Sequence, residues 1–132
     1  MSDLNRWTHE IRVPRLLGAF TAGRIMNPRT ARSQPMGGGM SSALLEATEL
    51  DARYARYVND NLADYLVPVN ADVPSVEVIM LSEEDDHVNP AGVKGLGELA
   101  NVGTNAAVCN AVFHATGERI RKLPVRLENI EV

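Results

Sequence analysis

The feature that most constrains the fold is a long run of small and apolar residues between residues 98 and 116. Alanine and valine recur through this run, which contains no proline and is long enough for several helical turns. Gly117 follows directly, where helices commonly place a left-handed C-cap residue. The pattern therefore predicts one main helix over residues 98–116.

Two apolar runs predict strands. Residues 76–81 form the clearer one, and residues 11–20 form another that is interrupted at Pro14. A second main helix is expected near residues 28–48, with a local break at the glycines of residues 37–39. This mixture indicates an α+β fold, with a small mixed or antiparallel sheet and two main helices.

Composition limits the classes of partner and compartment. The chain has 132 residues, 13 Lys and Arg, 17 Asp and Glu and a net charge of −4, without a basic cluster, so we expect no nucleic-acid partner. No apolar run approaches the ~20 residues of a membrane span, and the first residues do not resemble a signal peptide. A single cysteine suits a reducing compartment, so the expectation is a soluble cytoplasmic protein.

Glu98 is the candidate catalytic residue. It follows Lys94, Gly95 and Gly97, and glycines let a backbone approach a bulky ligand closely. A carboxylate beside a helix N-terminus is favoured in its charged form, which a general base needs. The alternative is a glutamate that only supports the first helical turn.

Gln34 is the candidate ligand-binding residue, close before Gly37 and Gly38. Its amide donates and accepts hydrogen bonds at once, which suits the edge of a pterin or a nucleobase. The alternative is an exposed glutamine at a helix end. The glycine run lacks the Lys-Ser/Thr pair of a P-loop, so it is a weak nucleotide motif.

The remaining reactive side chains do not predict a site. The acidic run at residues 83–86 and the histidine after it are typical of a solvated turn. Cys109 lies inside the small-residue helix and is interpreted as an apolar filler. The histidines lack metal-ligand spacing, so no metal ligands are predicted among them: His9, His87 and His114.

In order, six stretches resemble the C-terminal part of the molybdenum-binding (large) subunit of the xanthine dehydrogenase / aldehyde oxidase family. The resemblance covers residues 11–132 as a single domain, a fragment of the molybdopterin-binding domain, and leaves residues 1–10 as a divergent segment. The matching stretches are RVPRLLGAF, AGRIMNPRTARSQ, ALLE, NLADYLVPVNADVP, NPAGVKGLGE and NAVFHATGERIRKLP.

The resemblance implies a molybdenum–molybdopterin cofactor and an oxidoreductase acting as a hydroxylase or dehydrogenase. The family's K-G-x-G-E motif falls on Lys94, Gly95, Gly97 and Glu98, and its glutamate is the general base. Iron–sulfur and flavin subunits are the implied partners.

The family's pterin-contacting glutamine motif falls on Gln34, Gly37 and Gly38. Thr21 stands where relatives usually carry aspartate, and the stretch after the double glycine is shorter than in relatives. Other cofactor loops of the family precede this region. We therefore expect the isolated chain to bind no cofactor tightly and to be inactive.

Three interpretations stay open: an inactive small chain derived from the subunit, a structural or interaction module, or one half of a split enzyme completed by a partner chain. Separated from the rest of a large subunit, the chain is expected to expose apolar surface. It is therefore expected to form a homo-oligomer or to pair with a longer molybdenum-subunit chain. The residues expected on that surface are Leu16, Leu17, Phe20, Val76, Ile79, Met80, Val108 and Val112.

Overall fold

The computed structural model describes residues 3–4, 10–36 and 39–130. Helices and strands both occur, which confirms the α+β prediction. In chain order the elements are β1 (Asp3–Leu4), β2 (Ile11–Arg12), β3 (Leu16–Phe20), α1 (Pro28–Met36), α2 (Gly39–Leu44), β4 (Leu50–Asp51), β5 (Arg56–Tyr57), β6 (Val76–Met80), α3 (Asn101–Thr116) and the 3-10 turn η1 (Leu127–Asn129).

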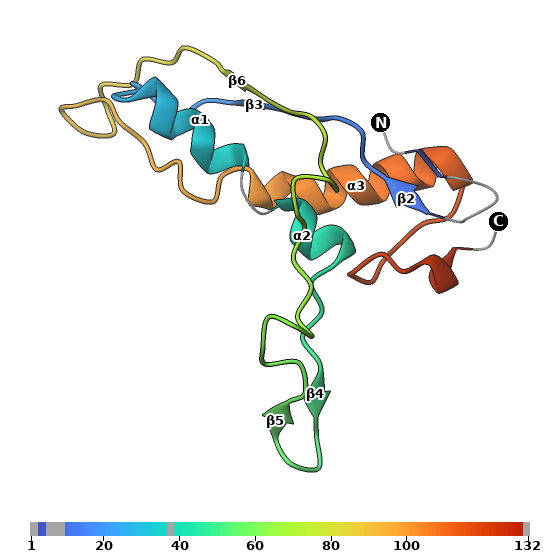
Figure 1. Ribbon diagram of the computed structural model, residues 1–132. Coiled ribbons are helices and arrows are strands. Elements are labelled where there is room, and N and C mark those ends of the chain that lie inside the picture. Colours follow the sequence, from blue (N-terminus) through green and yellow to red (C-terminus); the bar gives the residue numbers. More distant parts are fainter. Residues whose placement is uncertain (1–2, 5–9, 37–38, 131–132) are drawn as a thin grey trace.

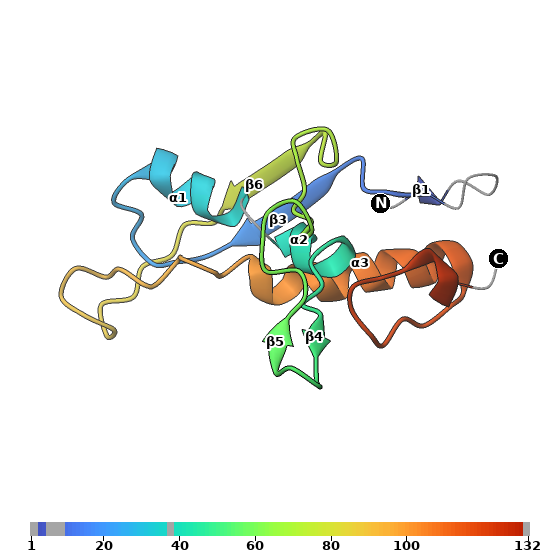
Figure 2. The same ribbon diagram turned by 60° about the horizontal axis from the view of Figure 1, so that its bottom comes forward.

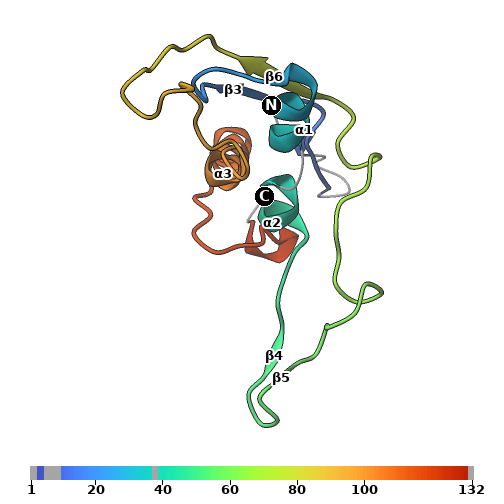
Figure 3. The ribbon, with the colours of Figure 1, turned by 90° about the vertical axis from the view of Figure 1, so that its left-hand side faces the viewer.

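The described strands form separate two-stranded pairs. β1 pairs with β2 and β4 with β5, both antiparallel, whereas β3 pairs with β6 in parallel. The predicted strand at residues 76–81 is confirmed as β6. A parallel pair needs a crossover, and here the crossover includes α1, α2 and the β4–β5 hairpin. All three helices lie on one side of the β3–β6 pair, as Figures 1 and 3 show.

The core lies between α2 and α3. Residues Thr104, Val108 and Val112 recur every fourth position along α3 and are buried, because this spacing aligns them on one face of a helix. Gly39 at the start of α2 lies so close to α3 that a Cβ there would come within 2.4 Å of the Thr104 hydroxyl oxygen. Ser42 adds a 2.8 Å hydrogen bond from its hydroxyl to Asn105 Oδ1.

The predicted ends of the helices need small corrections. The first expected helix is divided into α1 and α2, on either side of the glycine run, and the main helix begins at Asn101 because residues 97–100 form a turn. Gly117 has φ 83° and donates its N–H to the Phe113 carbonyl, which confirms the predicted C-cap. Within α3, Cys109 is half-buried, and burial raises the pKa of its thiol.

The expectation of exposed apolar surface is correct for Leu17 and Ile79 and wrong for Val108 and Val112 on the helix. The other strand residues expected on that surface are half-buried: Leu16, Phe20, Val76 and Met80. Leu17 and Ile79 are each 48% exposed on the uncovered face of the β3–β6 pair. Val108 and Val112 are buried, because Met40 and Ala43 pack near the first and the C-terminal residues Val125 and Ile130 pack against the second. The exposed large apolar residues of α3 are instead Val102, at 83%, and Phe113, at 37%.

The β4–β5 hairpin forms an arm that points away from the helices (Figures 1 and 3). Its apolar and aromatic residues are exposed, among them Leu50, Tyr54 and Tyr57. The guanidinium groups of Arg53 and Arg56 lie 5.7 and 5.8 Å from the centre of the Tyr54 ring. The arm therefore holds its shape by local contacts and contributes no buried core residue.

Candidate functional site

Two segments far apart in the sequence are hydrogen-bonded side by side. Residues 22–24 precede α1, and residues 92–94 precede the Glu98 turn. The Arg24 N–H donates to the Gly92 carbonyl at 2.7 Å, and the Lys94 N–H donates to the Ala22 carbonyl at 3.1 Å. The segment that leads to Glu98 is thereby held against the segment that leads into α1.

Lys94 lies at the centre of an ion-paired group that we call the Lys94 cluster: Gly23, Glu83, Asp85 and Lys94. The Lys94 ammonium lies 2.7 Å from Glu83 Oε1 and 2.9 Å from Asp85 Oδ2. The Gly23 N–H donates to the other Glu83 oxygen at 3.0 Å. The three charged side chains are only 29%, 30% and 27% exposed for Lys94, Glu83 and Asp85.

The charges in the Lys94 cluster stabilise one another. Hydrogen bonding by Lys94, and secondly by the Gly23 N–H, lowers the pKa of Glu83. Lys94 is likewise the main cause of the lowered pKa of Asp85. In return, Glu83 and then Asp85 raise the pKa of Lys94. All three groups are therefore held in their charged forms at neutral pH.

Glu98 lies in the turn immediately before α3. The Leu99 N–H donates to the Leu96 carbonyl, and the Asn101 N–H donates to the Glu98 carbonyl at 3.0 Å, which shapes this turn. The Glu98 side chain is exposed, and within the described ranges it has no hydrogen-bond or ion-pair partner. Its carboxylate is therefore available to a ligand.

Open space surrounds the two glycines beside Glu98. A Cβ on Gly95 or Gly97 would meet nothing within 4 Å, and neither residue has a left-handed φ. Neither backbone conformation nor packing within the described chain requires glycine here. This agrees with a group outside the described chain that approaches the backbone closely, as expected for a bulky cofactor.

Gln34 is exposed in the last turn of α1. Asn27 starts this helix by accepting the Arg29 and Thr30 N–H groups on its side-chain oxygen. The C-terminal end of α1 lies near the N-terminal end of α3, which Glu98 precedes (Figures 1 and 2). Two other predicted cofactor-binding residues, Gly37 and Gly38, lie outside the described residues.

Sequence reasoning missed the role of the acidic run. Glu83 and Asp85 were expected to be solvated, but both bind Lys94. Alternate residues of an extended segment point to the same side, and this spacing was the available signal. It shows why two carboxylates separated by one residue meet the same ammonium.

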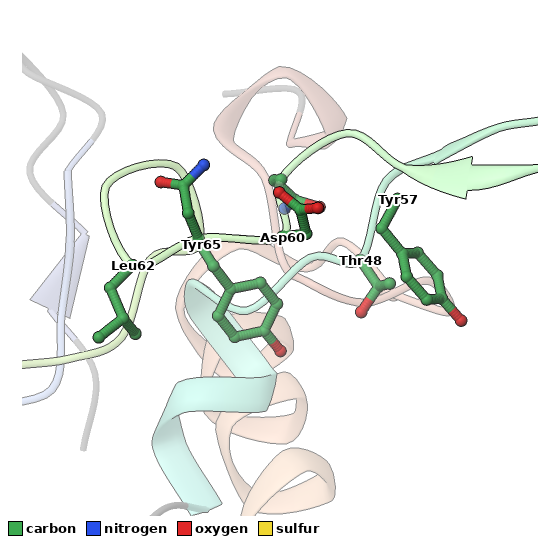
Figure 4. A pocket seen from close by; sticks show the side chains of 7 residues that line it. Thr48, Tyr57, Asp60, Leu62 and Tyr65 are labelled. Atoms are coloured by element: carbon green, nitrogen blue, oxygen red, sulfur yellow. The ribbon is translucent and has the colours of Figure 1, made fainter. Parts of the chain in front are cut away.

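A separate pocket of about 340 Å³ lies at the base of the arm, as Figure 4 shows. None of the residues predicted for the cofactor site lines it. In it, the Tyr65 hydroxyl lies 3.4 Å from Glu46 Oε2. Its lining residues are Thr48, Tyr57, Asn59, Asp60, Asn61, Leu62 and Tyr65.

Comparison with known proteins gives the family. Residues 3–74 match the sequence profile of the molybdopterin cofactor-binding domain. The chain belongs to this molybdopterin cofactor-binding family. The match includes Gln34 and begins before residue 11, at β1.

Relatives extend the family match to Glu98. The chain is 47% identical over 126 residues, 93% of its length, to the aldehyde oxidoreductase molybdenum-binding subunit PaoC of Escherichia coli. It is 35% identical over 119 residues, 88% of its length, to the putative xanthine dehydrogenase molybdenum-binding subunit XdhA of the same species. It spans only 17% and 16% of these relatives' lengths.

The fold also matches solved structures of an oxidoreductase and a dehydrogenase. Quinoline 2-oxidoreductase of Pseudomonas putida aligns with a TM-score of 0.79 and 28% identity, over 97% of this chain and 17% of that one. CO dehydrogenase of Oligotropha carboxidovorans shares the fold, with a TM-score of 0.75, 23% identity and coverage of 87% and 15%. The chain thus has the fold of one part of a molybdenum hydroxylase large subunit.

Two kinds of feature are absent from the described ranges. There, no group of three or more His, Cys, Asp or Glu side chains is arranged to hold a metal ion. No helix in those ranges combines the length and apolar character needed to cross a bilayer.

Proposed function

We propose that this chain supplies the general base and part of the pterin-binding surface of a molybdenum hydroxylase. The observation that carries the proposal is the exposed Glu98 carboxylate, which has no partner among the described residues and lies beside Gly95 and Gly97, whose flanking space is open. When bound, the molybdenum cofactor supplies two-electron oxidation chemistry. Glu98 accepts a proton from the group that attacks the substrate.

Gln34 would hold the pterin through its amide, which both donates and accepts hydrogen bonds. Gly37 and Gly38 would continue this contact along the chain. On the other side, the backbone of Lys94, Gly95 and Gly97 would lie along the cofactor. Support comes from the exposure of Gln34 in the last turn of α1, whose C-terminal end lies near the N-terminal end of α3 (Figures 1 and 2).

The isolated chain is not expected to turn over substrate. It corresponds to 17% of PaoC, and one glutamine with one glutamate cannot enclose a large anionic cofactor. The active form would include a longer molybdenum-subunit chain. Iron–sulfur and flavin subunits, which the family resemblance implies, would complete it. A multi-subunit assembly is supported by one relative, which is named as the gamma subunit of the 6-hydroxypseudooxynicotine dehydrogenase complex of Paenarthrobacter nicotinovorans.

A second candidate is a non-catalytic interaction module, including a homo-oligomer. Leu17, Ile79 and Val102 are exposed apolar residues, and exposed apolar surface favours a partner when it is contiguous. Sedimentation equilibrium of the purified chain tests this candidate. A monomer with no turnover in any complemented enzyme would argue against both functions.

The test of the catalytic proposal uses a chimera in which this chain replaces the matching part of PaoC. We expect Glu98→Gln to lower kcat at least about hundredfold, because the amide cannot accept the proton, with molybdenum content unchanged. Glu118→Gln, at an exposed glutamate beyond α3, is the matched control. A Glu98→Gln chimera with undiminished turnover contradicts the proposal.

A further inference from the structure

We propose that Lys94 is a positioning residue: through the Lys94 cluster it fixes the Glu98 turn relative to α1, which carries Gln34. The inference rests on the proposed function of Glu98 and Gln34. It assigns to the Lys94 side chain a role through other residues, while its backbone remains part of the cofactor-binding stretch.

The Lys94 ammonium is directed to two carboxylates of the same chain. Lysine has three N–H donors, and Lys94 directs its ammonium to Glu83 and Asp85 at 2.7 and 2.9 Å. A lysine neutralised by two carboxylates is a poor binding group for an anionic ligand, because the net charge of the three side chains is −1. The positive charge of Lys94 is neutralised by carboxylates of its own chain.

The Lys94 cluster connects segments that are far apart in the sequence. Glu83 accepts the Gly23 N–H on one oxygen and the Lys94 ammonium on the other. Asn89 fixes the same stretch by donating its side-chain N–H to the Val93 carbonyl at 2.6 Å. The cluster therefore joins three segments, of which one leads into α1 and another leads into the Glu98 turn.

The residues between Lys94 and Glu98 have few restraints of their own. Lys94 is followed by Gly95 and Gly97, which have no neighbouring atoms within 4 Å of a Cβ position to restrain them. Apart from the Leu99–Leu96 hydrogen bond inside the turn, restraint on the Glu98 turn comes from its two ends. One end is α3, and the other is the Lys94 cluster together with the backbone hydrogen bonds between residues 22–24 and 92–94. Loss of the Lys94 side chain weakens one end while leaving α3 folded.

Amide hydrogen exchange of the full 132-residue chain at neutral pH tests the restraint without any cofactor. In Lys94→Met we expect exchange about tenfold faster at the Gly23, Arg24 and Lys94 amides, the scale of a lost hydrogen bond to a charged group, and unchanged exchange within α3. Lys94→Arg, which keeps the charge, should restore protection. Lys122→Met, at an exposed lysine, is the matched control.

Unchanged exchange at Gly23 and Lys94 in Lys94→Met overturns the inference. If that variant unfolds, Asp85→Asn carries the same comparison. It removes one of the two charged partners of Lys94 and leaves the Glu83 contact in place. Local loss of protection supports the inference, and unaltered protection overturns it.

The PaoC chimera separates positioning from direct cofactor binding. Lys94→Met should lower kcat about tenfold or more, with KM and molybdenum content retained, and Lys94→Arg should recover most of the rate. Loss of molybdenum from Lys94→Met would mean direct binding and would overturn the inference. Undiminished turnover in Glu98→Gln would refute the proposed function instead, whatever the exchange data show.

Discussion

The α2–α3 pair and the β4–β5 arm place their apolar residues in opposite environments. Met40, Ala43 and Val108 are buried together between the helices, whereas Leu50 and Tyr57 remain exposed on the arm. The packed pair can be stabilised by this chain alone, because burial of apolar surface drives folding. The arm has no such stabilisation from the described residues. The difference indicates which parts fold by themselves and which parts need a covering surface.

The largest expected effect comes from removing volume in the packed pair. Met40→Ala should lower the free energy of unfolding by about 2–5 kcal/mol, because it leaves a cavity beside Val13 and Val108. The matched control is Met26→Ala, at a methionine that is 72% exposed, with an expected change below about 0.5 kcal/mol. Urea denaturation measures both, and equal effects would refute the contrast.

Two glycine substitutions should change stability in opposite directions. Gly39→Ala places a Cβ within 2.4 Å of the Thr104 hydroxyl, so it should destabilise the chain by about 1–3 kcal/mol. Gly103→Ala on α3 meets nothing within 4 Å and should stabilise the chain by up to about 1 kcal/mol. Thermal unfolding gives both signs. A neutral Gly39→Ala would mean that α2 does not approach α3 as described.

The Lys94 cluster should stabilise the chain over a defined pH range. The lowered pKa values of Glu83 and Asp85 mean that their contribution is present above the ordinary carboxylate pKa and is lost as pH falls through the lowered values. The raised pKa of Lys94 means that its contribution is lost only as pH rises through the raised value. NMR shifts of the Gly23 and Lys94 amides should stay constant from about pH 5 to 9. A transition near neutral pH would contradict this.

The smallest effect is expected on the arm. Tyr54→Ala removes the ring that lies near Arg53 and Arg56, yet the free energy of unfolding should change by less than about 0.5 kcal/mol. Tyr54 is 69% exposed and is not one of the buried core residues. Urea denaturation measures this change, and a loss above 2 kcal/mol would show that the arm supports the body.

The local parts of the fold follow from sequence, whereas the long-range contacts do not. Alanine spacing, Gly117 and a β-branched run predicted α3, its C-cap and β6 because these depend on near neighbours. The parallel pairing of β3 with β6 and the burial of Val112 depend on residues far along the chain.

The site shows the same division. Glu98 and Gln34 could be proposed from motifs and a resemblance, and both are exposed. The partners of Lys94 could not be identified, because Glu83 and Asp85 reach it only after residues 22–24 and 92–94 come together.

The central claim is that this chain holds one part of a cofactor site that the rest of a molybdenum subunit must complete. Molybdenum measured by elemental analysis tests it most directly, in the purified chain and in the PaoC chimera prepared in the same cells. The account predicts no molybdenum above background in the isolated chain and about one atom per chimeric subunit. Stoichiometric molybdenum in the isolated chain, or none in a folded chimera, would contradict it.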